Sequence, residues 1–451
     1  MAISGLKRVL GLPEVSFIAI GFTIGGGVFV FTGIVLRIAG PALPLAYALA
    51  VIPVFISMLP LAMLGAAIPA TGGNYKYPSR MVSPGLAFVG VWTYALATFF
   101  GQIPLYSLAC ARYAAVFMPG LPLELAAAGI ITVFTLINLF GVRLAAQFQA
   151  LMVMILIAAL LYFSAAGLAR FEPTNFAEFG VSGVKGVLLG TALLTFTYFG
   201  SNSVIELGGE IKNPGRVIPR AFMIAFPVVM LLYLLLAIAL VGAAPWREAA
   251  AADEPLLSVG KSFLSRIGFL FFVAGGAILA LMTTLNAIFI VGTKSLLALI
   301  SDNLLPRSLG RINRRFGTAH LLFLIIWALS LAGVFSGLPL ETFASYAALG
   351  GLVIFFPVLL ASIRLPKRYP ELYRQSGFRL KGVFLWLCPA VGFAMILFFG
   401  VAILADLKSP LKIALFVVFM LSGGLYYYLR KRFLLASGED LADLLKLEDW
   451  T

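Results

Sequence analysis

The sequence has 451 residues, of which 62% are hydrophobic and only 11% are charged. Soluble proteins carry about a quarter charged residues, so this composition predicts a membrane protein and excludes a set of soluble domains. The formal net charge of +14 does not indicate nucleic-acid binding, because the basic residues lie in short loops between apolar runs, where they set membrane topology.

Twelve runs along the chain are apolar and long enough for a transmembrane helix, which needs about 20 residues. They span approximately 13–36, 41–68, 84–110, 122–142, 146–168, 184–209, 219–242, 267–298, 320–336, 342–363, 383–405 and 410–429. The first run follows Lys7 and Arg8 and exceeds signal-peptide length, so we expect it to stay as a span. Cys110 and Cys388 lie inside apolar runs and are expected as small buried residues, whereas His320 is expected at the membrane interface.

The loops between the runs predict the orientation of the chain. With a cytoplasmic N-terminus, the inner loops and ends hold most of the 32 lysines and arginines, whereas the longest outer loop, near 243–266, carries mixed charges. The positive-inside rule therefore predicts a multi-pass protein of the plasma (inner) membrane with both termini in the cytoplasm. After the last run, Leu441, Leu444, Leu445 and Leu447 fit one face of an amphipathic helix at the inner surface, and a partly ordered tail fits equally well.

Glycine clusters interrupt two of the runs. In the first run, Gly25, Gly26 and Gly27 stand halfway along the span, where each glycine costs a helix about 1 kcal/mol. In the sixth run, Gly200 stands at a comparable depth, beside Tyr198, Phe199 and Asn202. Lipid provides no water for the freed backbone groups, so unwound backbone at this depth must line a cavity or be buried in protein. Close helix packing is the alternative explanation for one such cluster.

The matched positions of the two clusters favour a solute site between two repeats. Runs one and six are five apart, which is typical of a 5+5 inverted repeat with broken helices 1 and 6 and a site at the repeat interface. We therefore expect an all-α polytopic protein of about 12 transmembrane helices. Its expected parts are a first repeat at 1–170, a second repeat at 171–365, and two C-terminal helices with a cytoplasmic tail at 366–451.

Several short motifs occur in an order that resembles the amino acid–polyamine–organocation superfamily of permeases, which shares the fold of the sodium-coupled leucine transporters. The motifs are IGGGVF at 24–29 with Gly33, AGPA at 39–42, IPATGGNY at 68–75, NLFGVR at 138–143, EIKNPGRVIPR at 210–220, LNA at 285–287 and LLPR at 304–307. The resemblance covers most of the first ten runs. It implies a secondary transporter that moves amino acids by alternating access.

The resemblance also implies where an amino acid would bind. Its carboxylate would meet the amides of Gly25, Gly26 and Gly27, and its amino group would meet carbonyls near Ile24, Tyr198 and Phe199. Tyr198 or Phe199 would act as an aromatic gate unless the pair serves only packing. Asn202 and Gln102 would reach the side chain of the substrate, next to Gly200.

The coupling ion is less clearly indicated. Many members of the superfamily carry a buried lysine in the fifth helix, but Leu156 aligns with that lysine here, and the run 146–168 has no Lys, Arg, Asp, Glu or His. A sodium ion is one expectation, held by carbonyls of Gly21, Ile24 and Ala280 and by hydroxyls of Thr283 and Thr284, which share a helix face. Exchange without a coupling ion and proton coupling are the other two.

Glu206 is the one acidic residue expected inside a span. It precedes Glu210 by about one turn, about 6 Å deeper in the membrane at 1.5 Å per residue. With a basic partner from an inner loop it would latch a cytoplasmic gate, and as a cation ligand it would favour a polyamine substrate. An interfacial carboxylate without a specific role is the third reading.

Other functions are less consistent with the sequence. Catalysis within the membrane needs paired Asp, His or Ser–His groups in the spans, and an ATP-driven pump needs a G-x-x-x-x-G-K-S/T loop, and this sequence has neither. We expect a transporter rather than an enzyme, without a cofactor other than a coupling sodium. Polyamine or organic-cation transport and uncoupled amino-acid exchange remain alternatives. Nothing in the sequence requires a partner chain.

Overall fold

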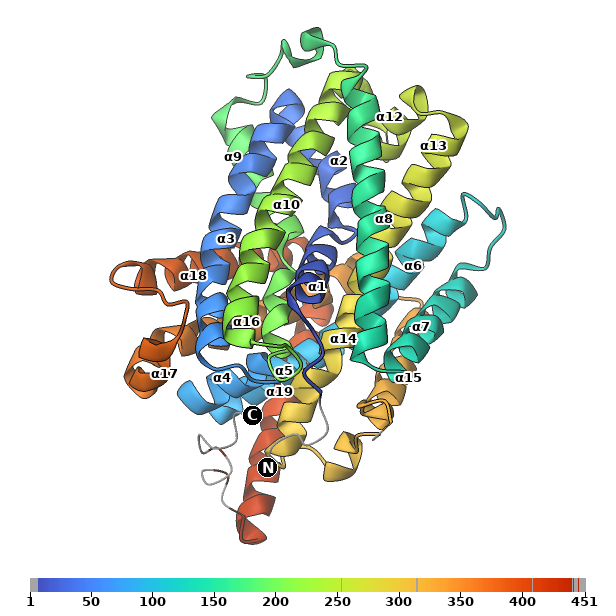
Figure 1. The fold of residues 1–451 in the computed structure, drawn as a ribbon. Helices are drawn as coiled ribbons and strands as arrows, with labels where there is room; N and C mark the ends of the chain where they lie inside the picture. The colour runs from blue at the N-terminus through green and yellow to red at the C-terminus, as the bar shows by residue number, and fades with distance from the viewer. Residues whose placement is uncertain are drawn as a thin grey trace.

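The computed structural model describes residues 7–252, 254–313, 315–407, 409–439, 441 and 445. Within these residues every regular element is a helix (Figure 1). The first nine α-helices are α1 (Leu12–Ile24), α2 (Gly27–Ala39), α3 (Leu43–Ala67), α4 (Gly73–Met81), α5 (Pro84–Leu96), α6 (Ile103–Ala114), α7 (Leu123–Leu139), α8 (Val142–Leu168) and α9 (Gly183–Leu194). The others are α10 (Pro214–Ala243), α11 (Trp246–Ala251), α12 (Pro255–Phe263), α13 (Arg266–Phe271), α14 (Leu279–Ser301), α15 (His320–Val334), α16 (Leu340–Arg368), α17 (Pro370–Gln375), α18 (Phe384–Leu407) and α19 (Pro410–Ala436).

Many of these helices are long and apolar enough to cross a membrane. Nine such stretches lie within the described residues: Gly27–Ala67, Pro84–Ala114, Val142–Leu168, Gly183–Glu206, Pro214–Ala243, Arg266–Ser301, Leu340–Arg368, Phe384–Ala405 and Pro410–Ala436. Three shorter apolar helices, α1, α7 and α15, accompany them. The chain is therefore a polytopic helical membrane protein, as its composition predicts.

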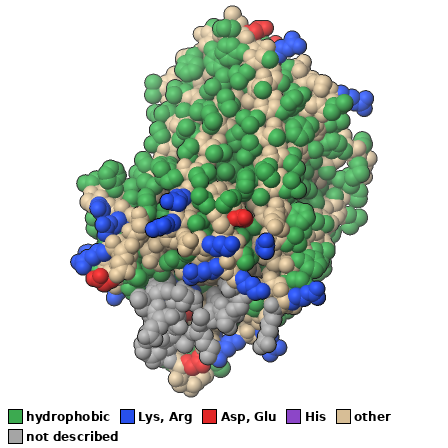
Figure 2. Space-filling model, in the orientation of Figure 1, with side chains coloured by type: hydrophobic (Ala, Val, Ile, Leu, Met, Phe, Trp, Pro, Cys, Tyr) green, Lys and Arg blue, Asp and Glu red, His purple; other side chains and the backbone are tan. Residues whose placement is uncertain are grey.

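The surface is divided between apolar and basic side chains. Figure 2 shows hydrophobic side chains over most of one face, and most of the Lys and Arg side chains in a band across its lower part. Long apolar helices with a basic band at one end match a protein whose middle is covered by lipid.

Helix α1 lies at the centre of the bundle (Figure 1) and packs against α8, α10 and α14. Its start is fixed locally, because the Glu14 carboxylate accepts a hydrogen bond of 2.8 Å from the Gly11 amide and Pro13 stands in the first turn. Helices α18 and α19 are peripheral: α18 packs on α16 and α3, and α19 packs on α5. The core that positions the site is thus built mainly from the first ten apolar runs, to which α18 adds Phe399.

Both glycine clusters interrupt helices as predicted. Helix α1 ends at Ile24, Gly25 adopts a φ of 45°, and α2 begins at Gly27. Helix α9 runs into a 3-10 turn at Thr195–Tyr198, Phe199 is extended, and Gly200 has a φ of 142°. The chain then continues in 3-10 turns over Ser201–Glu206. Positive φ at both breaks explains the need for glycine there.

Two further helices change their winding near the same level. A π-helical stretch at Ala97–Gln102 joins α5 to α6, and another at Phe272–Ile278 joins α13 to α14. Such stretches occur often at functional sites because they shift the faces that the flanking turns present. Here the first π-helical stretch ends at Gln102, and the second ends at Ile278, two residues before Ala280.

The structure also locates the cysteines, the histidine and the tail leucines that the sequence analysis considered. Cys110 and Cys388 are both buried and not bridged. His320 is half buried and stacks on Phe316, with ring centroids 6.0 Å apart. Of the leucines expected on an amphipathic tail, Leu441 and Leu445 join an apolar cluster, whereas Leu444 and Leu447 lie outside the described residues.

Candidate functional site

The two chain breaks are in direct contact with each other. A methyl group on Gly200 would lie 2.5 Å from the carbonyl oxygen of Phe22 in α1, so only glycine fits at this crossing. The amide of Ser201, next in the chain, donates a hydrogen bond of 3.1 Å to the Thr23 hydroxyl. A side chain of α1 thus satisfies one freed backbone group of the second break, as a low-dielectric setting requires.

Tyr233 of α10 ties both breaks to a third helix. Its hydroxyl lies 2.9 Å from the carbonyl oxygen of Ile24, 3.4 Å from that of Thr23, and 3.2 Å from that of Thr197. One hydroxyl has a single proton to donate, so it serves these three acceptors in turn. Tyr233 is completely buried, and its ring packs against Tyr47 and Tyr198.

A cavity of about 160 Å³ opens where the two breaks meet. Pockets for drug-sized ligands measure about 300–1,000 Å³, so this one suits a smaller solute. Its walls come from both breaks, from the α5–α6 region, from α16 and from Phe399 of α18. The lining residues are Phe22, Thr23, Ile24, Gly25, Gly27, Tyr94, Gln102, Leu105, Tyr106, Phe196, Thr197, Phe199, Gly200, Asn202, Ser203, Ala344, Ala347, Ala348, Gly351, Leu352, Phe355 and Phe399.

The cavity wall is uncharged and has two chemical characters. None of the described residues that line it is Asp, Glu, Lys, Arg or His. Polar groups come from the backbone at the breaks and from hydroxyl and amide side chains such as Gln102 and Asn202. The side chains of Phe199, Phe355 and Phe399 form an aromatic cluster, in which Phe199 meets the other two rings edge-on, with centroids 5.9 and 6.3 Å away.

Most of the residues predicted to bind a substrate line this cavity. They are Ile24, Gly25, Gly27, Gln102, Phe199, Gly200 and Asn202. Gly26 is not among the lining residues, and a methyl group on it would lie 2.2 Å from the Leu281 side chain. Tyr198 also lies behind the wall, where its hydroxyl donates to the Tyr47 carbonyl at 3.2 Å. Of the two aromatic residues considered for a gate, only Phe199 faces the cavity.

The backbone at the first break offers groups of both polarities. The first N–H groups of a helix have no partner within it, and α2 begins at Gly27, on the cavity wall. The positive end of the α2 dipole points the same way and favours an anionic group such as a carboxylate. The carbonyls at the end of α1, beside the same cavity, favour a positively charged or donor group instead.

Sequence comparison identifies the family. Residues 14–434 match the family of amino acid permeases, which is nearly the whole chain. The chain belongs to the amino acid permease family. It is therefore a transmembrane permease of amino acids or related solutes and not an enzyme, which agrees with the resemblance seen in the motifs.

Individual relatives of this permease carry several different substrate names. The methylthioribose transporter of Bacillus subtilis is 28% identical over 447 residues, which cover 95% of this chain and 94% of that protein. The branched-chain amino acid permease of the same organism is 28% identical over 452 residues, again 95% of this chain and 94% of that protein. A vacuolar cationic amino acid transporter of Arabidopsis thaliana is 27% identical over 340 residues, 69% of this chain and 55% of that protein.

The groups predicted to hold sodium lie together in this permease, but they are engaged with one another. The Thr283 hydroxyl lies 3.1 Å from the Gly21 carbonyl and 2.9 Å from the Ala280 carbonyl, and the Thr284 hydroxyl lies 3.3 Å from the latter. The Ile24 carbonyl accepts from Tyr233. The five groups predicted for a sodium site thus lie close together, and the structure leaves that prediction open.

Glu206, the predicted gate residue, is buried between two other elements of the permease. One carboxylate oxygen accepts from the Asn74 amide at the start of α4 at 2.7 Å, and the other accepts from the Ser295 hydroxyl of α14 at 2.6 Å. Glu206 is only 2% exposed, so it is not a carboxylate at the membrane surface. A small second cavity lined by Glu206 shares Tyr94 and Ser203 with the main one.

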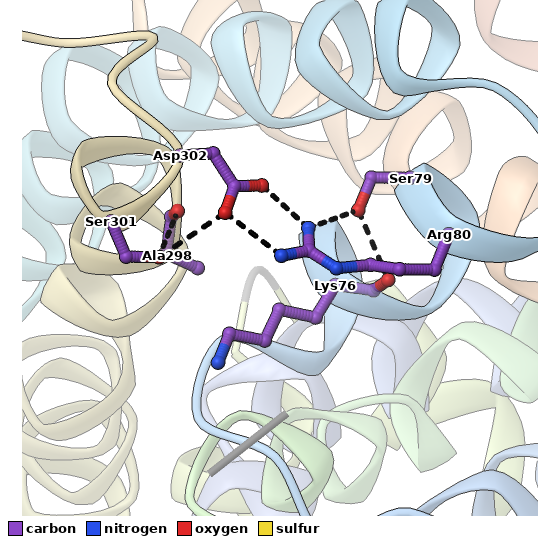
Figure 3. Close-up of polar contacts among 6 residues, drawn as sticks. All are labelled: Lys76, Ser79, Arg80, Ala298, Ser301 and Asp302. Atoms are coloured by element: carbon purple, nitrogen blue, oxygen red, sulfur yellow. Dashed lines mark hydrogen bonds and ion pairs between the residues drawn. The ribbon is translucent and has the colours of Figure 1, made fainter. Parts of the chain in front are cut away.

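Two buried ion pairs lie beyond Glu206, on the basic side of the molecule. Lys294 of α14 pairs with Glu210 at 2.8 Å. Arg80 of α4 pairs with Asp302, the residue that follows α14, through two bonds of 2.5 and 2.8 Å. Figure 3 shows the guanidinium group of Arg80 directed at the Asp302 carboxylate, with Ser79 beside it. The hydrogen-bond donors of Glu206 are thus neutral groups, while Lys294, which pairs with Glu210, also acts on Glu206 through its charge.

Sequence reasoning missed three parts of the site. It did not select Tyr233, although a lone tyrosine in an apolar run is a detectable signal. It tested the run 146–168 for charged groups only, and so passed over Gln149, an amide near the start of that run. It did not pair Arg80 with Asp302, because their distance in sequence is 222 residues and no periodicity connects them.

Proposed function

We propose that this permease is a secondary transporter of neutral amino acids and that its substrate binds in the cavity at the two breaks. The observation that carries the proposal is the uncharged wall of that cavity, formed by unwound backbone on one side and aromatic rings on the other. A zwitterion brings one carboxylate and one ammonium group, and the backbone at the breaks offers a partner for each. An apolar substrate side chain then lies against the rings.

Each predicted binding residue has a role in this proposal. Amides near Gly25 and Gly27 hold the carboxylate, and carbonyls near Ile24 and Phe199 receive the ammonium group. Gln102 and Asn202 reach the polar part of the substrate, and Phe199 closes over it. Gly200, on the wall, sets the crossing with α1. Gly26 and Tyr198 position the binding groups from behind the wall, because their own contacts are with Leu281 and Tyr47.

The named relatives carry neutral and cationic substrates alike, so the cavity wall has to decide between them. The branched-chain amino acid permease of Bacillus subtilis fits an apolar wall directly. Cationic amino acids and polyamines each need a further anionic anchor, and the described lining residues include no carboxylate. The methylthioribose transporter, equally similar, makes an uncharged thioether sugar the second candidate, since the same rings and amides suit it.

The arrangement in the membrane follows from the same proposal. The nine long apolar stretches and α1, α7 and α15 make up about twelve spans. Helices α1 and α2 form the two halves of the first span, and α3, in the same stretch as α2, forms the second. Spans 1–5 and 6–10 form the inverted repeats, α18 and α19 follow them, and both termini lie in the cytoplasm. The basic band in Figure 2 supports this orientation, and the bacterial relatives support a place in the cell membrane.

Uptake by proteoliposomes tests the substrate. Purified protein is reconstituted and loaded with unlabelled leucine, and uptake of labelled leucine is measured with competitors outside. Leucine, isoleucine and methionine should compete, whereas lysine and putrescine should not. Competition by lysine or putrescine alone would refute the neutral substrate, and competition by methylthioribose alone would favour the second candidate.

A further inference from the structure

A chain of buried amide side chains runs from α7 to the end of α1. The Asn138 amide nitrogen donates to the Phe134 carbonyl at 2.9 Å and to the Asn286 side-chain oxygen at 3.0 Å. The Asn286 nitrogen in turn donates to the Ala145 carbonyl at 2.9 Å and to the Gln149 side-chain oxygen at 2.9 Å. All three amide side chains are buried.

These hydrogen bonds fix the orientation of the last amide side chain, that of Gln149. Nitrogen and oxygen of an amide side chain are distinguished by their hydrogen-bond partners, and a backbone carbonyl accepts only donors. Two such carbonyls, at Phe134 and Ala145, fix the nitrogens of Asn138 and Asn286. The Gln149 oxygen must then face Asn286, so the Gln149 NH₂ group is turned the other way.

The NH₂ group of Gln149 lies beside Gly21, one of the residues predicted to hold sodium. A methyl group on Gly21 would lie 2.4 Å from this nitrogen and 3.2 Å from the Thr283 Cβ atom, so both side chains approach the same face of Gly21. The nitrogen has no hydrogen-bond partner among the described residues, although it is fully buried. An amide nitrogen is a donor with a partial positive charge, and the C-terminal end of α1 favours positive charge.

We propose that Gln149 decides the ion requirement of this permease. Its fixed NH₂ group places a partial positive charge beside Gly21, near the C-terminal end of α1, and so excludes sodium from this position. Hydroxyl groups rotate to offer a lone pair to an ion, but the amide chain holds Gln149 as a donor. This inference rests on the proposed transport function. It predicts that transport is not coupled to sodium.

Thermal unfolding of the purified protein tests the proposal without any substrate. The melting temperature is measured in sodium chloride and in choline chloride at the same ionic strength. The wild type should melt within about 1 °C in the two salts. Gln149→Glu turns the donor into an oxygen acceptor beside the same carbonyls, so sodium should raise its melting temperature by about 3 °C or more. Gln147→Glu, on the exposed face of α8, is the matched control and should show no difference.

Each outcome of this test supports or overturns the inference. Stabilisation of the wild type by sodium would overturn it, as would a Gln149→Glu protein that folds and ignores sodium. If Gln149→Glu is not recovered as folded protein, Gln149→Asp takes its place with the same expected response. Leucine uptake, measured separately, tests the proposed function. If leucine is not the substrate, uptake fails but the melting temperatures in the two salts are unaffected, so the two failures can be told apart.

Discussion

At the scale of single residues, the glycines of the two breaks serve different purposes. Gly200 combines a φ of 142° with a backbone carbonyl 2.5 Å from where a methyl group would stand. Gly25 needs its positive φ, but the nearest atom to an added methyl group is the Thr284 hydroxyl at 2.9 Å. A methyl group added to Gly26 would meet only the side chain of Leu281. Substitution should therefore cost most at Gly200, because backbone cannot move aside.

Gly200→Ala should reduce leucine uptake by at least about tenfold, because it forces α1 and the second break apart. Strained backbone of this kind costs about 1–3 kcal/mol per residue, and 1.4 kcal/mol corresponds to a factor of ten. Uptake into proteoliposomes measures the effect. Gly129→Ala in α7 is the control, since an added methyl group meets nothing within 4 Å there. Equal uptake by the two variants would contradict a site at the crossing.

Tyr233→Phe should weaken substrate binding without unfolding the protein. The change removes one buried hydroxyl and leaves the carbonyls of Ile24 and Thr197 without that donor, a loss of about 0.5–1.5 kcal/mol. Isothermal titration with leucine should show a Kd raised about two- to tenfold. Tyr428→Phe on the exposed side of α19 provides the comparison, and an unchanged Kd for Tyr233→Phe would remove this residue from the site.

At the scale of elements, α4 is held at both of its ends near the basic side of the molecule. Its first turn receives the Glu206 carboxylate at the Asn74 amide, and its last turn is held to the end of α14 by Arg80 and Asp302. Glu206 lies just after the second break, and the cavity it lines adjoins the main cavity. Rearrangement of the second break therefore acts directly on the contacts that hold α4.

Asp302→Asn should loosen α4 and open the route to the cavity from the cytoplasmic side. Removing one partner of a buried ion pair costs about 3–5 kcal/mol, and side chains of this pair are only 1% and 2% exposed. Ser203→Cys, in a background with Cys110→Ala and Cys388→Ala, reports opening through its reaction with an impermeant maleimide in inside-out vesicles. Labelling should be at least about tenfold faster with Asp302→Asn.

Glu439→Gln is the control for that experiment. It breaks the exposed pair between Glu439 and Arg307, and exposed pairs contribute about 0–1 kcal/mol. Labelling of the introduced cysteine should therefore stay at the level of the parent protein. Equal labelling rates with Asp302→Asn and Glu439→Gln would show that the Arg80–Asp302 pair does not hold the gate.

At the scale of the whole molecule, the sequence predicted the features that depend on local chemistry. Apolar length predicted the helices, and glycine propensity placed the breaks at Gly25–27 and Gly200, since both signals lie within a few residues. The partners of Glu206, the position of Tyr198 behind the cavity wall and the amide chain ending at Gln149 depend on how helices distant in sequence are rotated against each other. Hydrophobicity is nearly uniform around these helices, so no periodic pattern reports that rotation.

The structure of the permease with its best-transported neutral amino acid bound tests the central claim most directly. The account predicts the substrate carboxylate within hydrogen-bonding distance of the amides at Gly25–27, and the substrate side chain against Phe199 and Phe355. It further predicts the Gln149 nitrogen, and no sodium, beside Gly21. A substrate bound away from the two breaks, or with its carboxylate turned toward the aromatic rings, would contradict the account.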